Sequence, residues 1–125
     1  KKLLKPNEKL LVDGCHSMAS AKNLYDYLKN LKEPIYGIWG MQKNKLPEQF
    51  IKCFKNIFKK VLVLTIPNEP NAIKAEKLKL IAKKYMPADK SSNIQAALKK
   101  LSSKKKKTIV VFGSLYLIGG VLNKN

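Results

Sequence analysis

Short apolar runs alternate with amphipathic segments along the chain, and this alternation restricts the possible folds more than any other feature of the sequence. Runs of this kind, separated by helical periodicities, are typical of βαβ units with a buried, mainly parallel sheet. We therefore expect an α/β fold, a three-layer Rossmann-like domain with a mostly parallel sheet flanked by helices on both faces. The expected strands are residues 9–13, 35–39, 60–66 and 108–112.

The segments between these runs carry apolar residues at helical spacing. Ser17 and Asn93 each stand directly before such a segment, where a short polar side chain can cap the helix. No linker or internal repeat divides the chain, and its 125 residues suit one domain. A single domain is therefore expected over residues 1–125, with helices at residues 18–31, 46–58, 72–85, 94–101 and 115–122.

The chain is strongly basic, with 26 Lys and Arg against 8 Asp and Glu and a formal net charge of +18. Such a charge raises nucleic acid or an anionic surface as a partner. Every basic residue is a lysine, however, whereas bidentate recognition of bases and phosphates favours arginine. The lysines are also spread along the expected helices. A solvated, lysine-rich surface is therefore favoured over nucleic-acid binding, and a basic α/β module that binds RNA or anionic surfaces is the alternative.

The two cysteines, Cys15 and Cys53, form neither a CxxC motif nor a metal-ligand set with the single histidine. The first residues lack the apolar core of a signal peptide. The longest apolar stretch, residues 109–122, contains glycines and is shorter than the ~20 residues that a membrane span needs. We therefore expect no disulfide framework, no metal site, no membrane association and a cytoplasmic location.

Two polar turns follow the first and the last expected strands. Asp13 and His16 lie in the first turn, and Ser114 lies in the second. Parallel strands end at one edge of a sheet, and ligands of α/β proteins bind there. An aspartate at a strand end can accept two hydrogen bonds from a ribose diol, and His16 stands just before a helix N-terminus, which favours anions. These three residues are therefore the candidate site.

Each turn also has a purely structural interpretation. Asp13 could bond to nearby backbone N–H groups while His16 lies on the surface, and Ser114 could simply cap the next helix. Ser114 is not in a G-x-S-x-G motif and a hydrolase triad is unsupported. The chain has no GxxxxGK(S/T) loop for nucleoside triphosphates. Trp39 either lines a cleft or belongs to the core, and the core is favoured.

The order of these segments resembles the C-terminal domain of folylpolyglutamate and dihydrofolate synthases, relatives of the Mur ligases. The family's strand ending L-(L/V)-D-G-A-H-N-P is similar to residues 10–16, and its T-G-S-L-Y-L-V-G motif is similar to residues 112–119. Residues 37–45 are similar to a G-x-x-x-x-K-D-K-D-like stretch, and residues 19–22 match an alanine-containing helix. The similarity covers essentially the whole chain, and its last motif favours the folate branch over the Mur ligases.

Several positions depart from the pattern of this family. Ser17 and Met18 stand where the family has Asn-Pro after the histidine, and Asn44 replaces an acidic residue. Residues 67–70 lack the arginine often found in the family's proline-rich loop. The arginine that usually precedes this domain would lie upstream of Lys1.

The resemblance implies the C-terminal domain of an ATP-dependent folate:glutamate ligase. In such enzymes a P-loop domain binds ATP and Mg²⁺, a substrate carboxylate is converted to an acyl phosphate, and the amino group of glutamate displaces phosphate. The C-terminal domain closes over this site. The resemblance implies that Asp13 and His16 bind ATP, and that His16 and Ser114 bind the incoming glutamate and serve catalysis.

The same resemblance implies the partners of the domain. An N-terminal ATPase domain, absent from the chain, would hold most of ATP and Mg²⁺, so the isolated domain is expected to be inactive and to carry no metal ligand. The substrates would be L-glutamate and either a folate or dihydropteroate, with both reactions left open. A monomer is expected.

Overall fold

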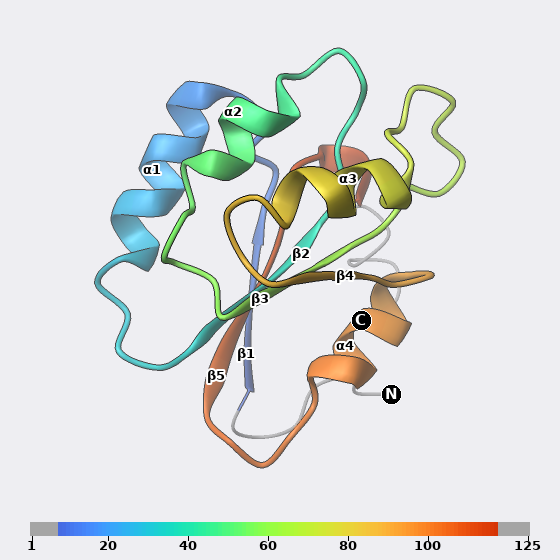
Figure 1. Ribbon diagram of the computed structural model, residues 1–125. Helices are drawn as coiled ribbons and strands as arrows, with labels where there is room; N and C mark the ends of the chain where they lie inside the picture. Colours follow the sequence, from blue (N-terminus) through green and yellow to red (C-terminus); the bar gives the residue numbers. More distant parts are fainter. Residues whose placement is uncertain (1–7, 118–125) are drawn as a thin grey trace.

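The computed structural model describes residues 8–117. They form a five-stranded sheet in the order β1-β5-β2-β3-β4, in which every neighbouring pair is parallel (Figure 1). The predicted α/β class is therefore confirmed. The strands are β1 (Glu8–Asp13), β2 (Ile35–Trp39), β3 (Lys60–Val63), β4 (Ala88–Lys90) and β5 (Lys107–Phe112).

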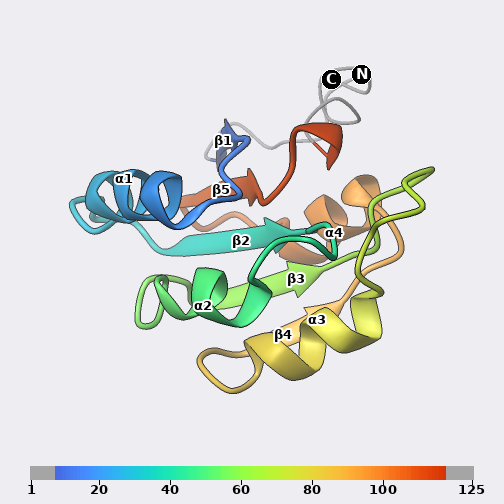
Figure 2. The ribbon, with the colours of Figure 1, turned by 90° about the horizontal axis from the view of Figure 1, so that it is seen from above.

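Helices lie on both faces of this sheet, so the predicted three layers are present (Figure 2). The helices α1 (Met18–Leu28), α2 (Pro47–Lys52) and α3 (Ala75–Ala82) pack on one face, and α4 (Ile94–Leu101) packs on the other. Side chains alternate along β5, because Val110 and Phe112 face the first three helices whereas Ile109 and Val111 face α4. Every residue of β5 is buried, as expected for a central parallel strand.

Both predicted helix caps are confirmed. Ser17 and Ser20 form a capping box, in which the Ser20 backbone N–H donates to Ser17 Oγ at 3.2 Å and the Ser17 N–H donates to Ser20 Oγ at 3.1 Å. The Ala96 N–H donates to Asn93 Oδ1 at 2.8 Å. The first cap fixes the start of α1 directly after the turn that carries His16.

An aromatic cluster holds the end of β5 in place. The Phe112 ring lies 5.2 Å from the Phe58 ring, 5.3 Å from Phe54 and 6.0 Å from Phe50. Trp39 stacks on the same ring at 6.5 Å and is fully buried. The core interpretation of Trp39 is therefore confirmed, and the turn after Phe112 leaves from a rigidly packed strand end.

Several predicted elements have the wrong extent. The second helix ends at Lys52 instead of residue 58, because the chain turns through a left-handed Asn56 (φ 71°) and brings Phe58 back into the core. The third helix spans only Ala75–Ala82 instead of residues 72–85, and residue 72 forms an antiparallel bridge with Gln42. The strand expected at residues 60–66 ends at Val63.

Other differences concern short or terminal elements. The sequence did not indicate β4, which has only three residues and a single buried one, Ala88. The first helix ends at Leu28 instead of residue 31. Of the helix expected at residues 115–122, residues 115–117 are helical and the remainder lies outside the described residues. Within residues 8–117, no helix has the length and apolar character that crossing a bilayer requires.

Candidate functional site

The first and last strands are neighbours, and this brings the two polar turns together. Asp13 pairs with Phe112 in the parallel register of β1 and β5. The turn with Asp13 and His16 and the turn with Ser114 therefore leave the sheet at the same end, which we call the carboxyl edge. The prediction that these three residues share one edge is confirmed.

Asp13 already uses one of its carboxylate oxygens within the turn. The Cys15 backbone N–H donates to Asp13 Oδ1 at 2.9 Å, so the predicted structural role of this aspartate is present. A carboxylate has about four lone-pair sites on its two oxygens. The turn bond therefore leaves acceptor capacity that a diol could use.

His16 lines a pocket of about 280 Å³ between the turn after β1 and the loop after β2. Its Nδ1 is buried and has no hydrogen-bond partner among residues 8–117. The pocket does not include Ser114, and the loop after β2 forms its other side. The lining residues are His16, Ser17, Met18, Asn44, Lys45, Leu46 and Phe50.

Ser114 is 2% exposed and its hydroxyl oxygen accepts a hydrogen bond from the Tyr116 N–H at 3.1 Å. This bond is the helix cap that the structural interpretation of Ser114 predicts. The residue before it, Gly113, has φ +110°, and a Cβ there would overlap the Gly40 carbonyl oxygen and approach Trp39 Cδ1 to 2.7 Å. Only glycine therefore lets the end of β5 pack so closely on the end of β2.

Trp39 adds a second unpaired polar atom to this edge. Its Nε1 is buried without a hydrogen-bond partner, and it and His16 Nδ1 are the only such side-chain atoms among residues 8–117. An unsatisfied buried polar group costs about 1–3 kcal/mol and in a native structure demands an explanation. The sequence indicated Trp39 as core but carried no signal that its indole N–H would be unpaired.

Cys15, between the two predicted ligand residues, is not a nucleophile. Burial, and to a lesser extent the Asp13 charge and Cys53, raises the pKa of the Cys15 thiol to about 12. The thiol is therefore protonated at neutral pH, and a protonated thiol is unreactive.

The carboxyl edge also has a larger hollow, of about 630 Å³, beside the segment after β3. Glu69 ties this segment to the loop after β2, since Gln42 Nε2 donates to Glu69 Oε2 at 2.8 Å. The sequence indicated this segment only as a departure from the family's pattern. Its lining residues are Thr65, Ile66, Pro67, Asn68, Glu69, Pro70, Lys74 and Ser92.

Comparison with known proteins identifies the family. Residues 1–124 match the family described as "Dihydrofolate synthetase, C-terminal domain". The chain belongs to this family. A search among curated protein sequences gave no significant match.

Solved structures of folylpolyglutamate synthases share the fold. The Mycobacterium tuberculosis enzyme complexed with ADP and AMPPCP is 19% identical with a TM-score of 0.81, over 92% of this chain and 29% of that chain. E. coli FolC in complex with DHPP and ADP is 16% identical with a TM-score of 0.83, over 98% of this chain and 30% of that chain. The Thermotoga maritima enzyme is 26% identical with a TM-score of 0.72, over 88% of this chain and 26% of that chain. The chain thus spans less than a third of each relative.

Proposed function

We propose that this domain is the part of an ATP-dependent folate:glutamate ligase that closes over reactants held by an N-terminal ATPase domain. The observation that carries the proposal is the family match over residues 1–124. Relatives with this fold were solved with ADP, with AMPPCP and with AMPPNP and Mn. Residues 8–117 contain no group of three or more His, Cys, Asp or Glu side chains that could hold a metal ion. Mg²⁺ would be held mainly by the ATPase domain.

Asp13 and His16 fit a nucleotide at the carboxyl edge. Asp13 keeps free lone pairs after its bond to the Cys15 N–H, and these would accept the hydroxyl groups of the ribose. His16 lines the pocket of about 280 Å³ beside this turn, so a ligand group that enters the pocket would meet its side chain.

Ser114 fits a role toward glutamate. A hydroxyl has one donor and two acceptor lone pairs, and the Tyr116 N–H occupies one of those lone pairs. The Ser114 O–H can therefore donate to a carboxylate of the incoming amino acid. Its burial holds the group in one place, so donation costs little conformational entropy.

The reaction has two steps. A carboxylate oxygen of the folate substrate attacks the γ-phosphorus of ATP and ADP leaves, which gives an acyl phosphate. The amine of glutamate attacks the acyl carbon, phosphate leaves, and the amine loses a proton, which gives the amide. Water must be excluded meanwhile because it would hydrolyse the acyl phosphate.

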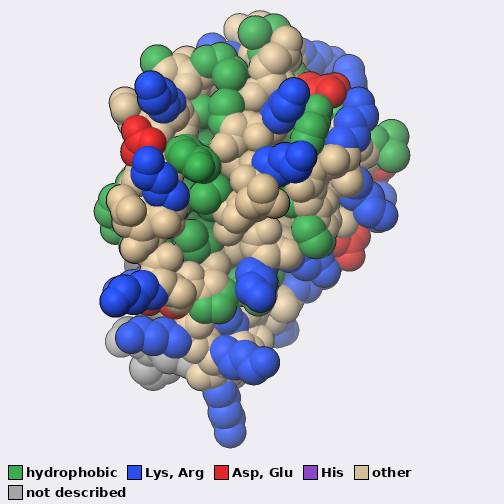
Figure 3. Space-filling view, turned by 60° about the vertical axis from the view of Figure 1, so that its left-hand side comes forward, with side chains coloured by type: hydrophobic (Ala, Val, Ile, Leu, Met, Phe, Trp, Pro, Cys, Tyr) green, Lys and Arg blue, Asp and Glu red, His purple; other side chains and the backbone are tan. Residues whose placement is uncertain are grey.

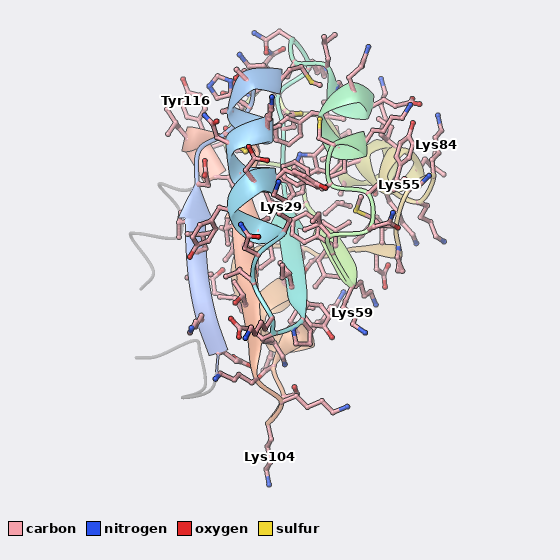
Figure 4. The ribbon with its side chains drawn as sticks, turned by 90° about the vertical axis from the view of Figure 1, so that its left-hand side faces the viewer. Lys29, Lys55, Lys59, Lys84, Lys104 and Tyr116 are labelled. Carbon is pink, nitrogen blue, oxygen red and sulfur yellow. The ribbon has the colours of Figure 1, made fainter. Side chains whose placement is uncertain are left out.

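Exposed apolar side chains at the carboxyl edge support closure. Met18 and Leu46 flank the His16 pocket, and Leu115 and Tyr116 follow Ser114. All four are exposed although they are large and apolar. Figure 4 shows Tyr116 pointing outward near the start of α1. Side chains of this kind are typical of surfaces that a partner covers, and the ATPase domain would be that partner.

A chimera tests the proposal. The C-terminal domain of E. coli FolC, which this chain matches over 98% of its own length, is replaced by this chain. We expect ATP-dependent transfer of radiolabelled glutamate to dihydropteroate or a folate. We also expect Asp13→Ala to raise the KM for ATP, whereas the isolated 125-residue domain hydrolyses no ATP. A folded, ATP-binding chimera with no more ligase activity than the ATPase domain alone would refute the proposal.

A further inference from the structure

A polar pocket of about 430 Å³ opens beyond the carboxyl ends of β3 and β4, and we call it the β3–β4 pocket. The polar side chains that line it belong to Thr65, Glu76, Lys90, Ser91, Ser92 and Lys100. They come from the segments after β3 and β4, the start of α3 and the end of α4. We propose that this pocket binds the phosphate group of a small phosphorylated metabolite.

The direction of the chain across the sheet reverses at this pocket. The strand β3 leads through α3, on one face of the sheet, to its neighbour β4. In contrast, β4 leads through α4, on the other face, back to β5, which lies between β1 and β2 (Figure 2). Ligands of open α/β sheets bind outside the carboxyl ends of the strands at such reversals. The pocket therefore lies where this kind of fold leaves room for a ligand.

Hydrogen-bond donors predominate in the pocket. Lys90 Nζ donates one of its three N–H groups to Glu76 Oε2 at 3.2 Å, and Lys100 Nζ donates one to the Lys90 carbonyl at 2.8 Å, so each keeps two. Thr65 and Ser92 add hydroxyl groups. A phosphate monoester carries about −1.5 to −2 charges at pH 7 and three strong acceptor oxygens, which matches this set of donors.

Hydrogen bonds hold the floor of the pocket in place. Ser91 is 7% exposed, its N–H donates to the Val63 carbonyl at 2.9 Å, and its hydroxyl donates to the Asn93 carbonyl at 3.2 Å. The Ala75 N–H donates to Thr65 Oγ1 at 2.9 Å, so Thr65 uses a lone pair and its O–H can still donate. These bonds fix the segments after β3 and β4, and a preformed site loses less entropy when a ligand binds.

The two lysines of the pocket also interact with carboxylates, but these carboxylates are exposed. In the pair of Lys90 and Glu76 the side chains are 44% and 69% exposed. The Lys90 backbone N–H and the Lys79 side chain, and to a smaller extent Lys100, lower the pKa of Asp89. Exposed pairs are weak because water and salt screen them. A phosphate dianion can therefore compete with Glu76 and Asp89 for the two ammonium groups.

The larger hollow beside the segment after β3 offers room for the rest of the ligand. Thr65 and Ser92 line both this hollow, of about 630 Å³, and the β3–β4 pocket, so the two adjoin. Pro67 and Pro70 also line the hollow. A ligand whose phosphate lies between the lysines can therefore extend a sugar or a larger group into the hollow and against the proline rings.

The β3–β4 pocket is separate from the candidate site of the ligase. None of Asp13, His16 and Ser114 lines the pocket or the larger hollow. Within the sheet, β4 is three strands away from β5, which corresponds to about 14 Å at the usual spacing of strands. Phosphate binding here is therefore compatible with the proposed ligase function and does not depend on it.

A neighbouring lysine supplies a matched control. Figure 3 shows lysines scattered over the visible face of the molecule, so a positive charge alone does not mark a site. Lys99 directly precedes Lys100 in the last turn of α4, is exposed and does not line the pocket. Lys99→Gln and Lys100→Gln therefore change the net charge equally and remove a charge from the same end of the same helix. Only Lys100→Gln removes a donor from the pocket.

Titration of the 125-residue chain with ribose 5-phosphate, followed by NMR shifts of backbone amides, tests the proposal. We expect shifts at Thr65, Ser91 and Ser92, and an affinity that falls as salt is added. Lys100→Gln should weaken binding about threefold to fivefold, since an exposed ion pair contributes modestly, whereas Lys99→Gln should leave it nearly unchanged. Equal losses in the two variants would overturn the proposal.

The carboxylate in the pocket provides a test of opposite sign. Glu76→Gln removes the group that competes for Lys90 and should therefore strengthen binding of ribose 5-phosphate about twofold to fivefold. Unchanged or weaker binding in Glu76→Gln would count against a phosphate between the two lysines.

Other ligands identify the source of the phosphate group. AMP that binds more tightly than ribose 5-phosphate, with additional shifts at Asn68 and Glu69, would support the site and identify a nucleotide. Inorganic phosphate that binds as tightly as either ester would also support it and identify free phosphate. Glutarate that shifts the same amides at a lower concentration than ribose 5-phosphate would assign the pocket to carboxylates and overturn the proposal. Shifts by phosphate esters that are confined to residues 13–17 would overturn it as well.

Discussion

Replacement of Gly113 by alanine should destabilise the domain strongly. At φ +110° an L-residue is strained by about 1–2 kcal/mol. The new Cβ would also overlap the Gly40 carbonyl oxygen, and overpacking of this kind costs typically about 1–3 kcal/mol. The sum is about 2–5 kcal/mol, a large part of the 5–15 kcal/mol typical of a domain. The melting temperature should fall by roughly 8–20 °C.

The chain carries its own probe for this measurement. Trp39 is the only tryptophan, is fully buried and lies against Gly113, so its fluorescence reports unfolding in urea. Gly40→Ala is the matched control, because its Cβ would meet the flexible Ile66 side chain at 3.1 Å and a backbone oxygen only at 3.3 Å. We expect a loss of about 1 kcal/mol there, at the lower end of what overpacking costs. If Gly113→Ala were no more destabilising than Gly40→Ala, the argument from close strand packing would be wrong.

Two further predictions concern charges. Lys107 Nζ lies 3.5 Å from Glu8 Oε2, and the two side chains are 4% and 0% exposed. Lys107→Met should therefore lower the free energy of unfolding, measured in urea, by about 3–5 kcal/mol, and adding Glu8→Leu should recover most of this loss. A loss below about 1 kcal/mol for Lys107→Met would contradict this. The hydrogen bond from Tyr85, and next that from Lys84, lowers the pKa of Glu48 below its usual 4.5. Because the folded pKa is the lower one, this stabilisation is present above pH 4.5 and lost as the pH falls through the folded value. As the pH falls, the free energy of unfolding should therefore decrease less steeply for Glu48→Gln than for the unsubstituted chain. Equal slopes would count against this role of Glu48.

Elements whose signals are local were predicted well. The helix α4 has its predicted bounds because Asn93 caps it and its apolar residues repeat at helical spacing. The strand β5 is an unbroken apolar run, which indicates a central position in a parallel sheet. Where the signal depended on distant partners, prediction failed. The apolar spacing continues past Lys52, but the helix stops there because Phe54 and Phe58 pack around Phe112.

For the candidate site, the sequence determined that Asp13 and Ser114 follow buried parallel strands and therefore share one edge, and the motifs around them indicated the family. Tertiary structure alone decided that the first and last strands pair, that His16 shares a pocket with the loop after β2, and that Trp39 Nε1 is left unpaired. Composition likewise gave the net charge but not the pocket that Lys90 and Lys100 line. The physical reason is that capping and apolar spacing depend on neighbours along the chain, whereas burial and hydrogen-bond pairing depend on residues that only the folded sheet brings together.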